Sequence, residues 1–323
     1  MGKILVTLGG VVVILLFAAL VAPYFIDWNH YKSEIESRSS AFFGRSVHID
    51  GQIVVRLLPQ PVLRLHGVRI DGAGNERFFE AEAIEARLAI EPLLKRNIQM
   101  THIELVKPVL TLIRGKRGIR NWKPDTGQTP ILAESDRVSV QNLHIQDGRI
   151  LYQDKTRNLA KSVTRINADL NAMSLRGPFK ISGVFGESDS DFKIATSRLG
   201  PENGFRLTGR MSGDFGEGRL SGVFQNVFDN PAFEGKLGFR RKKNRVNRIA
   251  LSSEAQLFLA DDILKIREIT GTLGEGGAQC VLGGHCLLTG EKPCVLPVRF
   301  RRAGQTLMLF WGAAAKNLSM VCC

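Results

Sequence analysis

The chain has 323 residues and a formal net charge of +13, and its 33 glycines and 12 prolines leave few helix-forming runs after residue 100. This composition favours short strands with many turns. All five cysteines fall within the last 44 residues, which excludes a fold that disulfides hold together throughout its length. The chain is long enough for one large β domain or two ordinary domains.

The first predicted element is a membrane-spanning helix over Ile4 to Ala22. This run of 19 residues is uncharged, and as a helix it would span roughly 28 Å, about the thickness of the hydrocarbon core of a bilayer. Thirteen of its residues are Leu, Ile, Val or Phe, and their insertion energies outweigh the cost of Thr7, Gly9 and Gly10. A cleaved signal peptide is the alternative, but the apolar run is longer than a signal peptide needs and no A-x-A precedes its polar boundary.

The charges on either side of this run predict its orientation. Lys3 precedes it, and a mixed-charge segment beginning at Asp27 follows it. The positive-inside rule therefore places the N-terminus in the cytoplasm and the chain after about Pro23 outside it. A basic net charge usually suggests nucleic acid or an anionic surface; for an exported chain we expect anionic lipid headgroups and no nucleic acid. A basic surface without a dedicated partner is the alternative.

A short juxtamembrane helix is predicted over Trp28 to Phe43. Asp27 is a suitable N-cap and Gly44 can end the helix. If the helix lies at the membrane interface, Trp28 and Tyr31 would lie at the level of the lipid headgroups. The alternative is a helix that packs on the end of the β-sheet.

From Arg45 onward the apolar period becomes that of β-strands. A pair of strands around a tight turn is predicted over 47–58, and Pro59-Gln60-Pro61 then interrupts the sheet, because proline cannot donate a ladder hydrogen bond. Gly67 is expected to mark a bulge. Further strands are predicted over 62–70, 81–90, 98–105 and 109–114, with a helical turn or two within 91–97.

A linker-like segment at 125–136 predicts an internal boundary near residue 125. After it, 138–145 and 149–153 are predicted to form a hairpin around Asp147-Gly148. Because the gaps that follow are too short for helical crossovers, the later strands should pair antiparallel. These strands are predicted over 163–173, 179–185, 191–196, 205–211, 219–224, 233–241 and 255–259.

The later strands should have one apolar and one wet face. In 205–209 and 233–240, Phe or Leu alternates with polar residues or glycine. Repeated glycine on strands permits strong bending of a sheet. The predicted fold is therefore mainly β, with one N-terminal transmembrane helix and a juxtamembrane helix followed by a long, curved, groove-like antiparallel sheet.

Several short motifs follow one another in a specific order. They include Asp27-Trp28, Phe43-Gly44-Arg45-Ser46-Val47, Leu57-Leu58-Pro59-Gln60-Pro61, Ile103-Glu104-Leu105-x-x-Pro108, Gly118-x-x-Asn121-Trp122 and Asp147-Gly148-Arg149-Ile150-x-Tyr152-x-Asp154. Over roughly residues 1–275 this order resembles the AsmA family of bacterial envelope proteins. The resemblance divides the chain into an anchor at 1–26, β segments at 27–125 and 126–275, and a tail at 276–323.

The resemblance implies a periplasmic protein anchored in the inner membrane and related to bridge-like lipid-transfer proteins. Its partners would be phospholipid, the inner membrane and an outer-membrane or envelope protein, and its role would be lipid transport or outer-membrane homeostasis. A diacyl lipid exposes about thirty methylenes, so crossing water bare would cost roughly 25 kcal/mol, which an apolar groove would largely remove.

The groove candidates are the apolar residues of the alternating strands. They are Leu63, Leu65, Phe179, Ile181, Phe205, Leu207, Phe233, Leu237 and Phe239. Periodicity alone fits an ordinary sandwich core as well, because a closed core and an open groove have the same alternation. A non-enzymatic envelope assembly factor that acts through protein contacts is the alternative function.

The tail departs from the family pattern. After Glu275 the sole acidic residue is Glu291, and 294–323 has no clean strand period. We hypothesise that this part is translated in a shifted frame, which truncates the family sequence; translating the neighbouring frames of the coding DNA tests this. A genuine divergent tail, with Cys322 and Cys323 oxidised or facing lipid, is the alternative.

No catalytic residue, metal site or cofactor is predicted. The six histidines include no close metal-ligand pair, and the sequence contains no C-x-x-C, nucleophile elbow or phosphate-binding P-loop. His48 and Asp50 would share a strand face, which is typical of a surface pair. We therefore expect a protein that is not an enzyme.

Overall fold

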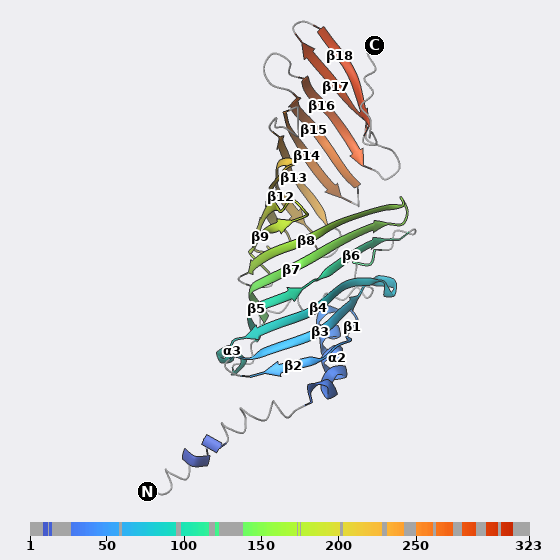
Figure 1. Ribbon diagram of the computed structural model, residues 1–323. Helices are drawn as coiled ribbons and strands as arrows, with labels where there is room; N and C mark the ends of the chain where they lie inside the picture. The colour runs from blue at the N-terminus through green and yellow to red at the C-terminus, as the bar shows by residue number, and fades with distance from the viewer. Residues whose placement is uncertain are drawn as a thin grey trace. The chain divides into compact units, whose positions relative to one another are not determined.

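The computed structural model describes residues 9–11, 13–14, 27–57, 60–94, 98–115, 120–122, 138–172, 174, 176–200, 203–227, 231–241, 250–260, 263–273, 280–288, 295–302 and 305–312. The described chain is mainly β (Figure 1). It divides into two compact units, Met1–Leu175 and Arg176–Cys323, called unit 1 and unit 2 below.

The predicted helix over Trp28 to Phe43 is confirmed. It begins as a 3-10 turn, η1 (Trp28–Tyr31), and continues as α2 (Lys32–Phe43). The Asp27 carboxylate accepts a hydrogen bond from the Asn29 N–H at 3.0 Å, and Gly44 ends the helix with a φ of 65°. Both predicted caps are therefore present.

The predicted anchor lies almost entirely outside the described residues. Of the run Ile4 to Ala22, only 9–11 and 13–14 are described, and they are helical. Among the described residues, no helix has both the length and the apolar character needed to cross a membrane. The transmembrane helix stays a prediction.

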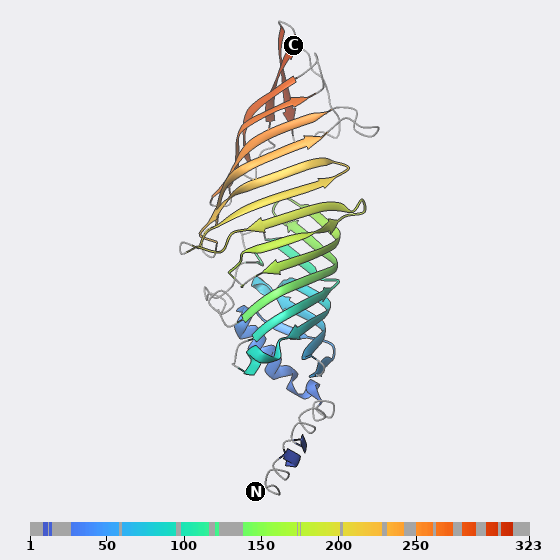
Figure 2. The same cartoon turned by 90° about the vertical axis from the view of Figure 1, so that its left-hand side faces the viewer.

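Unit 1 contains one sheet, and its strands are curved (Figure 2). Both β1 and β2 pair with β3, which pairs with β4; β5 and β6 lie between β4 and β7, and β8 pairs with β7. The elements are β1 (Val47–Ile49), β2 (Ile53–Arg56), β3 (Val62–Asp71), η2 (Ala73–Asn75), β4 (Arg77–Leu88), α3 (Ile90–Leu94), β5 (Ile98–Val106), β6 (Val109–Arg114), β7 (Val138–Asp154) and β8 (Leu159–Ala172).

The prediction of a hairpin over 47–58 is wrong, because β1 and β2 do not pair with each other. They lie end to end along β3, with His48 opposite Arg69 and Val54 opposite Arg64. The connection between them cannot reverse the chain, since the N–H groups of Asp50 and Gly51 also bond to β3, at 2.8 and 3.0 Å. Gly67 has a φ of 61° and lies opposite this connection, where a bulge was expected.

The prediction of a hairpin around Asp147-Gly148 is also wrong, because β7 is one continuous strand. Asp147 has a φ of 52° and interrupts the register with β8, so it forms a bulge. On the other side of β7, the connection between β5 and β6 lies at the same level, and Lys107 in it has a φ of 45°. Because both sides of β7 remain paired across this level, the Asp147-Gly148 step bends the strand without reversing it.

The partners of β7 bear on the predicted domain division. β7 pairs with β5 and β6 in parallel, so the strands on either side of 115–137 belong to one sheet. The compact units divide after Leu175. The linker itself, at 123–137, lies outside the described residues, and the family-based segments stay a prediction.

Unit 2 is a meander in which each described strand pairs antiparallel with the next, as predicted (Figure 2). Its strands are β9 (Phe179–Phe185), β10 (Ser190–Thr196), β11 (Phe205–Gly213), β12 (Gly216–Gln225), β13 (Ala232–Arg241), β14 (Leu251–Ala260), β15 (Ile263–Leu273), β16 (Cys280–Leu288), β17 (Val295–Arg302) and β18 (Gln305–Gly312). The last two form a hairpin within 294–323, where the sequence has no clean strand period. Strands pair through backbone hydrogen bonds, which do not require alternating side chains, so a hairpin can form where the sequence lacks that alternation.

Candidate functional site: an apolar sheet face

The register of unit 2 places its predicted groove residues on one face of the sheet. Residues that lie directly opposite each other in antiparallel strands direct their side chains to the same face. Phe179 shares this face because it lies two residues before Ile181. The cross-strand rows are Phe205–Phe224–Phe233–Leu259, Leu207–Gly222–Gly235–Leu257, Ile181–Ile194–Gly209–Leu220–Leu237–Ala255 and Phe192–Met211–Gly218–Phe239–Ser253. These rows are called the apolar face below.

The apolar face is partly open to solvent. Met211 is 46% exposed and Leu237 is 38% exposed, whereas fully buried core side chains would be nearly inaccessible. The described part of unit 2 contains no helix that could cover either face of this sheet. Apolar groups in such an open row are available for contact with another apolar molecule.

Phe233 is the buried exception, at 7% exposure, because its ring lies against two glycines. A Cβ atom on Gly222 or Gly235 would approach the Phe233 ring to 2.5 or 2.6 Å. The ring continues a ladder of aromatic side chains, with centroid separations of 5.3 Å from Phe205 to Phe224 and 4.7 Å from Phe224 to Phe233. The glycines thus leave room for an aromatic ring to cover the backbone.

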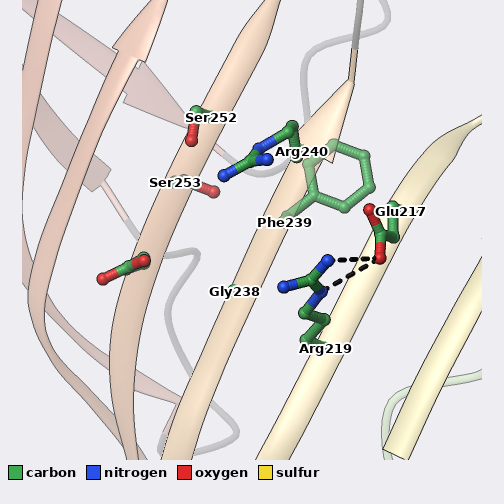
Figure 3. A pocket seen from close by; sticks show the side chains of 8 residues that line it. Glu217, Arg219, Gly238, Phe239, Arg240, Ser252 and Ser253 are labelled. Atoms are coloured by element: carbon green, nitrogen blue, oxygen red, sulfur yellow. Dashed lines mark hydrogen bonds and ion pairs between the residues drawn. The ribbon is translucent and has the colours of Figure 1, made fainter.

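The opposite face of the same strands is mainly polar and has more basic than acidic side chains. It carries Lys193, Arg206, Arg210, Arg219, Lys236 and Arg240. A pocket on this face is lined by residues that include Arg219, Gly238, Arg240 and Ser252 (Figure 3). The two faces therefore differ sharply in character, as the alternation predicted.

Glu217 organises the charges beside that pocket. Its carboxylate accepts hydrogen bonds from Nε and Nη2 of Arg219 at 2.9 and 2.8 Å, and Nε of Arg210 lies 3.5 Å away. The hydrogen bond from Arg219 holds the pKa of Glu217 below its usual value, and the charges of Arg210 and Arg240 act in the same direction. Because Arg210 and Arg219 are exposed and Glu217 is only half-buried, this is a solvated ion-pair cluster.

The remaining groove candidates, Leu63 and Leu65, lie in unit 1. They share one face of β3, where Leu65 lies opposite Ile53 on one side and Ile84 on the other. Both are half-buried. The nine candidates therefore belong to two apolar surfaces in two units, and the lipid-binding role of each stays a prediction.

Trp28 and Tyr31, the predicted interface residues, lie together at the start of the helix. Their ring centroids are 6.1 Å apart, and Tyr31 is 53% exposed while Trp28 is half-buried. A membrane contact of these rings stays a prediction.

Several residues of the apolar face are not among the groove candidates predicted from the sequence. Ile194, Met211, Leu220 and Phe224 occupy the same rows as the predicted candidates. Their strands were predicted, and Leu220, Gly222 and Phe224 alternate with polar or β-branched residues. The register between strands, which places them beside the candidates, has no sequence signal.

The motif residue Asn121 is structural. Its side chain is buried at 2% exposure and makes three hydrogen bonds: Oδ1 accepts from the Ile113 N–H at 2.8 Å, and Nδ2 donates to the carbonyls of Thr111 and Arg77 at 2.8 and 3.1 Å. Arg45 donates to the Asn121 carbonyl at 2.9 Å. Asn121 thereby ties β6, β4 and the end of the juxtamembrane helix together.

Asp154, the last residue of another motif, closes the turn between β7 and β8. It is 1% exposed, and Oδ1 accepts from the N–H groups of Thr156 and Arg157 at 2.9 and 3.1 Å. Within the ranges described above, no group of three or more His, Cys, Asp or Glu side chains could hold a metal ion. That the protein is not an enzyme stays a prediction.

Comparison with known proteins adds two findings. A family model described as the AsmA family matches residues 1–236. The AsmA family protein YhjG of Escherichia coli strain K12 is 23% identical over 314 residues, which cover 84% of this chain and 43% of that protein. The chain thus spans less than half the length of this relative. No solved structure matches.

Proposed function

Because the chain belongs to the AsmA family, we propose that it is an envelope protein whose apolar sheet face holds phospholipid acyl chains, for lipid transport or outer-membrane homeostasis. The observation that carries this proposal is the row structure of unit 2, which leaves Met211 and Leu237 exposed among apolar neighbours. Each methylene that moves from water to this surface gains about 0.8 kcal/mol, so binding needs no catalytic group.

The proposal includes attachment to the inner membrane. The run Ile4 to Ala22 would cross the bilayer with the N-terminus in the cytoplasm, and the two β units would lie in the periplasm. Trp28 and Tyr31 would then lie at the lipid headgroups. The proposal extends to a partner at the outer membrane or elsewhere in the envelope.

Photo-crosslinking tests which face meets lipid. A photoreactive residue at Leu207 or Leu237 should form phospholipid adducts in membranes, because both side chains lie on the apolar face. The matched controls are Thr208, which follows Leu207, and Lys236, which precedes Leu237. The side chains of both controls lie on the polar face. Equal lipid adducts at all four positions, or none at Leu207 and Leu237, would contradict the proposal.

The same experiment addresses the alternative function. An assembly factor that acts through protein contacts predicts protein adducts at Leu207 and Leu237 in place of lipid. Native mass spectrometry of the detergent-extracted protein provides a second measurement, in which we expect bound phospholipid.

A further inference from the structure

We propose that Arg241, the last residue of β13, binds the phosphate group of a phospholipid whose acyl chains lie on the apolar face. This inference rests on the proposed function, because it takes acyl chains on that face as given, and it adds which end of the face holds the headgroup. The ligand chemistry is that of a phosphodiester anion, whose oxygens match the parallel N–H groups of a guanidinium.

Arg241 lies on the side of the sheet that carries the apolar face. It follows Phe239 by two residues on the same strand, and side chains two residues apart point to the same side. A Cβ atom on Gly216 would lie 3.0 Å from the Phe239 ring and 3.1 Å from the Cβ of Arg241, so these three positions are neighbours on that side. Arg241 and its partner Leu251 therefore extend the apolar face by one row, at the end of their strands.

Arg241 is the one charged residue on this side of β9 to β14, whose strand residues all fall within the described ranges. The positions compared are every second residue of each strand, from Phe179 on β9, Ser190 on β10, Phe205 on β11, Gly216 on β12, Phe233 on β13 and Leu251 on β14. All the other positions hold apolar residues, glycine, serine or threonine. An apolar surface with a single cation at its end complements an amphiphile, because the chains meet the apolar part and the charge orients the head.

The guanidinium of Arg241 has an unused donor. Its Nε is inaccessible to solvent and has no hydrogen-bond partner among the described residues. A donor that burial takes away from water is unfavourable until an acceptor reaches it. The residue as a whole is only partly buried, so a ligand can approach the guanidinium from solvent. A phosphate oxygen there would satisfy the donor and balance the positive charge together.

The reach of an acyl chain from Arg241 fits the apolar face. Leu237 lies four residues before Arg241, about 13 Å along a strand. One leaflet is half of the hydrocarbon core of a bilayer, about 15 Å deep. A phospholipid held by its phosphate at Arg241 would therefore lay its chains over Phe239 and Leu237. Leu237 is 38% exposed, so its side chain is open to such a contact.

Arg240 provides a matched control. It is the neighbouring residue and has the same side chain, but it lies on the polar face, opposite Glu217 on one side and Ser252 on the other (Figure 3). Arg240 is exposed and its charge acts on Glu217. Replacing Arg240 therefore removes the same charge from the same strand without changing the apolar side.

The test compares two lipids that differ in the phosphate. The full chain, with a photoreactive residue at Leu237, is purified in detergent and given equal amounts of phosphatidylethanolamine and diacylglycerol with the same acyl chains. The headgroup of phosphatidylethanolamine has no net charge, so the general positive charge of the chain does not favour it. Mass spectrometry of the adducts at Leu237 should show an excess of phospholipid of about tenfold. Arg241→Gln should reduce this excess to about twofold or less and keep the diacylglycerol adducts, whereas Arg240→Gln should keep the excess.

The outcomes separate this inference from the proposed function. Adducts of neither lipid would overturn both, whereas equal adducts of the two lipids in the chain with Arg241 would overturn the phosphate site alone. Such equal capture is the result expected if Arg241 merely covers Phe239 with its stem and extends its head into water. Equal effects of Arg241→Gln and Arg240→Gln would also overturn the site, because they would indicate general charge.

A second variant keeps the comparison decisive if Arg241→Gln fails to fold. Arg241→Lys keeps the charge and loses the two parallel N–H groups, so it should retain part of the phospholipid excess. Loss of the whole excess in the folded lysine variant, with diacylglycerol adducts unchanged, would still support a guanidinium site, whereas an undiminished excess in both folded variants would overturn it.

Discussion

Buried polar side chains hold unit 1 together at points where its strands end. Asn121 satisfies backbone groups of β6 and β4, and Gly72 approaches it so closely that a Cβ there would lie 2.3 Å from the Asn121 carbonyl oxygen. A buried backbone group without a hydrogen-bond partner lowers the free energy of unfolding by more than an average hydrogen bond raises it. The motif Gly118-x-x-Asn121-Trp122 therefore has a structural explanation, at least at its asparagine.

Replacing Asn121 should destabilise unit 1 strongly. Asn121→Ala leaves the Ile113 N–H and two carbonyls without partners, and we expect a loss of roughly 2 to 4 kcal/mol in the free energy of unfolding. Asn142→Ala is the matched control, because its exposed amide donates one bond of 3.3 Å. Denaturant unfolding followed by circular dichroism measures both, and an equal effect of the two substitutions would refute the structural role.

Glu85 should make stability depend on pH. It is 6% exposed and lies between Arg64 and Arg87, with its Oε1 accepting from Nε of Arg87 at 3.1 Å. The hydrogen bond from Arg64 holds the pKa of Glu85 below its ordinary 4.5. The folded carboxyl loses its proton more readily than the unfolded one, so its contribution is complete above pH 4.5 and is lost as the pH falls through the lower folded pKa.

The measurement is the melting temperature against pH. Glu85→Gln should melt below the natural protein near neutral pH, and the difference should shrink once the pH falls below about 4.5. Glu82→Gln, on the same strand but in an exposed pair with Lys107, should change little at any pH. A difference for Glu85→Gln that grows towards acid would contradict the assignment.

At the scale of elements, glycine is used in two ways on β13. Gly235 is needed because a Cβ there would approach the Ser221 carbonyl oxygen to 2.4 Å and the Phe233 ring to 2.6 Å. Gly238 faces the polar side, where a Cβ would meet nothing within 4 Å. The same residue type on one strand therefore has opposite tolerance to substitution.

This difference predicts a contrast between two alanine variants. Gly235→Ala should lower the free energy of unfolding by about 1 to 3 kcal/mol, because the backbone of β12 cannot move aside without losing its pairing. Gly238→Ala should leave stability unchanged or raise it by up to about 1 kcal/mol, since alanine restricts the unfolded chain. Thermal unfolding tests both variants. Equal losses of stability would show that the Phe233 ring does not pack against Gly235.

At the scale of the whole molecule, the N-terminal run decides where the chain resides. If Ile4 to Ala22 is the anchor, replacement of residues 1–26 by a cleavable signal peptide should move the protein from the membrane fraction to the soluble periplasmic fraction. The β-sheet signal in circular dichroism should persist, because the described sheets contain no residue of that segment. Retention of the truncated chain in the membrane fraction would assign membrane attachment to another part.

Much of the fold follows from local pattern. The caps Asp27 and Gly44, the β period after Arg45 and the alternation of Phe and Leu in unit 2 all act within a few residues, so they are legible in the sequence. Pairing between distant strands is different. Nothing local near Asp147 distinguishes a bulge in one long strand from a hairpin turn, because the parallel partners of that strand lie about forty residues earlier.

The candidate site divides in the same way. The sequence by itself determined which residues are apolar and which strand face each one takes, since side-chain direction follows from a period of two. Only the tertiary structure decided that Leu207, Gly222 and Gly235 form one row, and that Asn29, Glu36 and Ser40 face the edge of β1 and β2. Register and docking depend on hydrogen bonds between segments far apart in the chain, and such bonds leave no local trace in the order of residues.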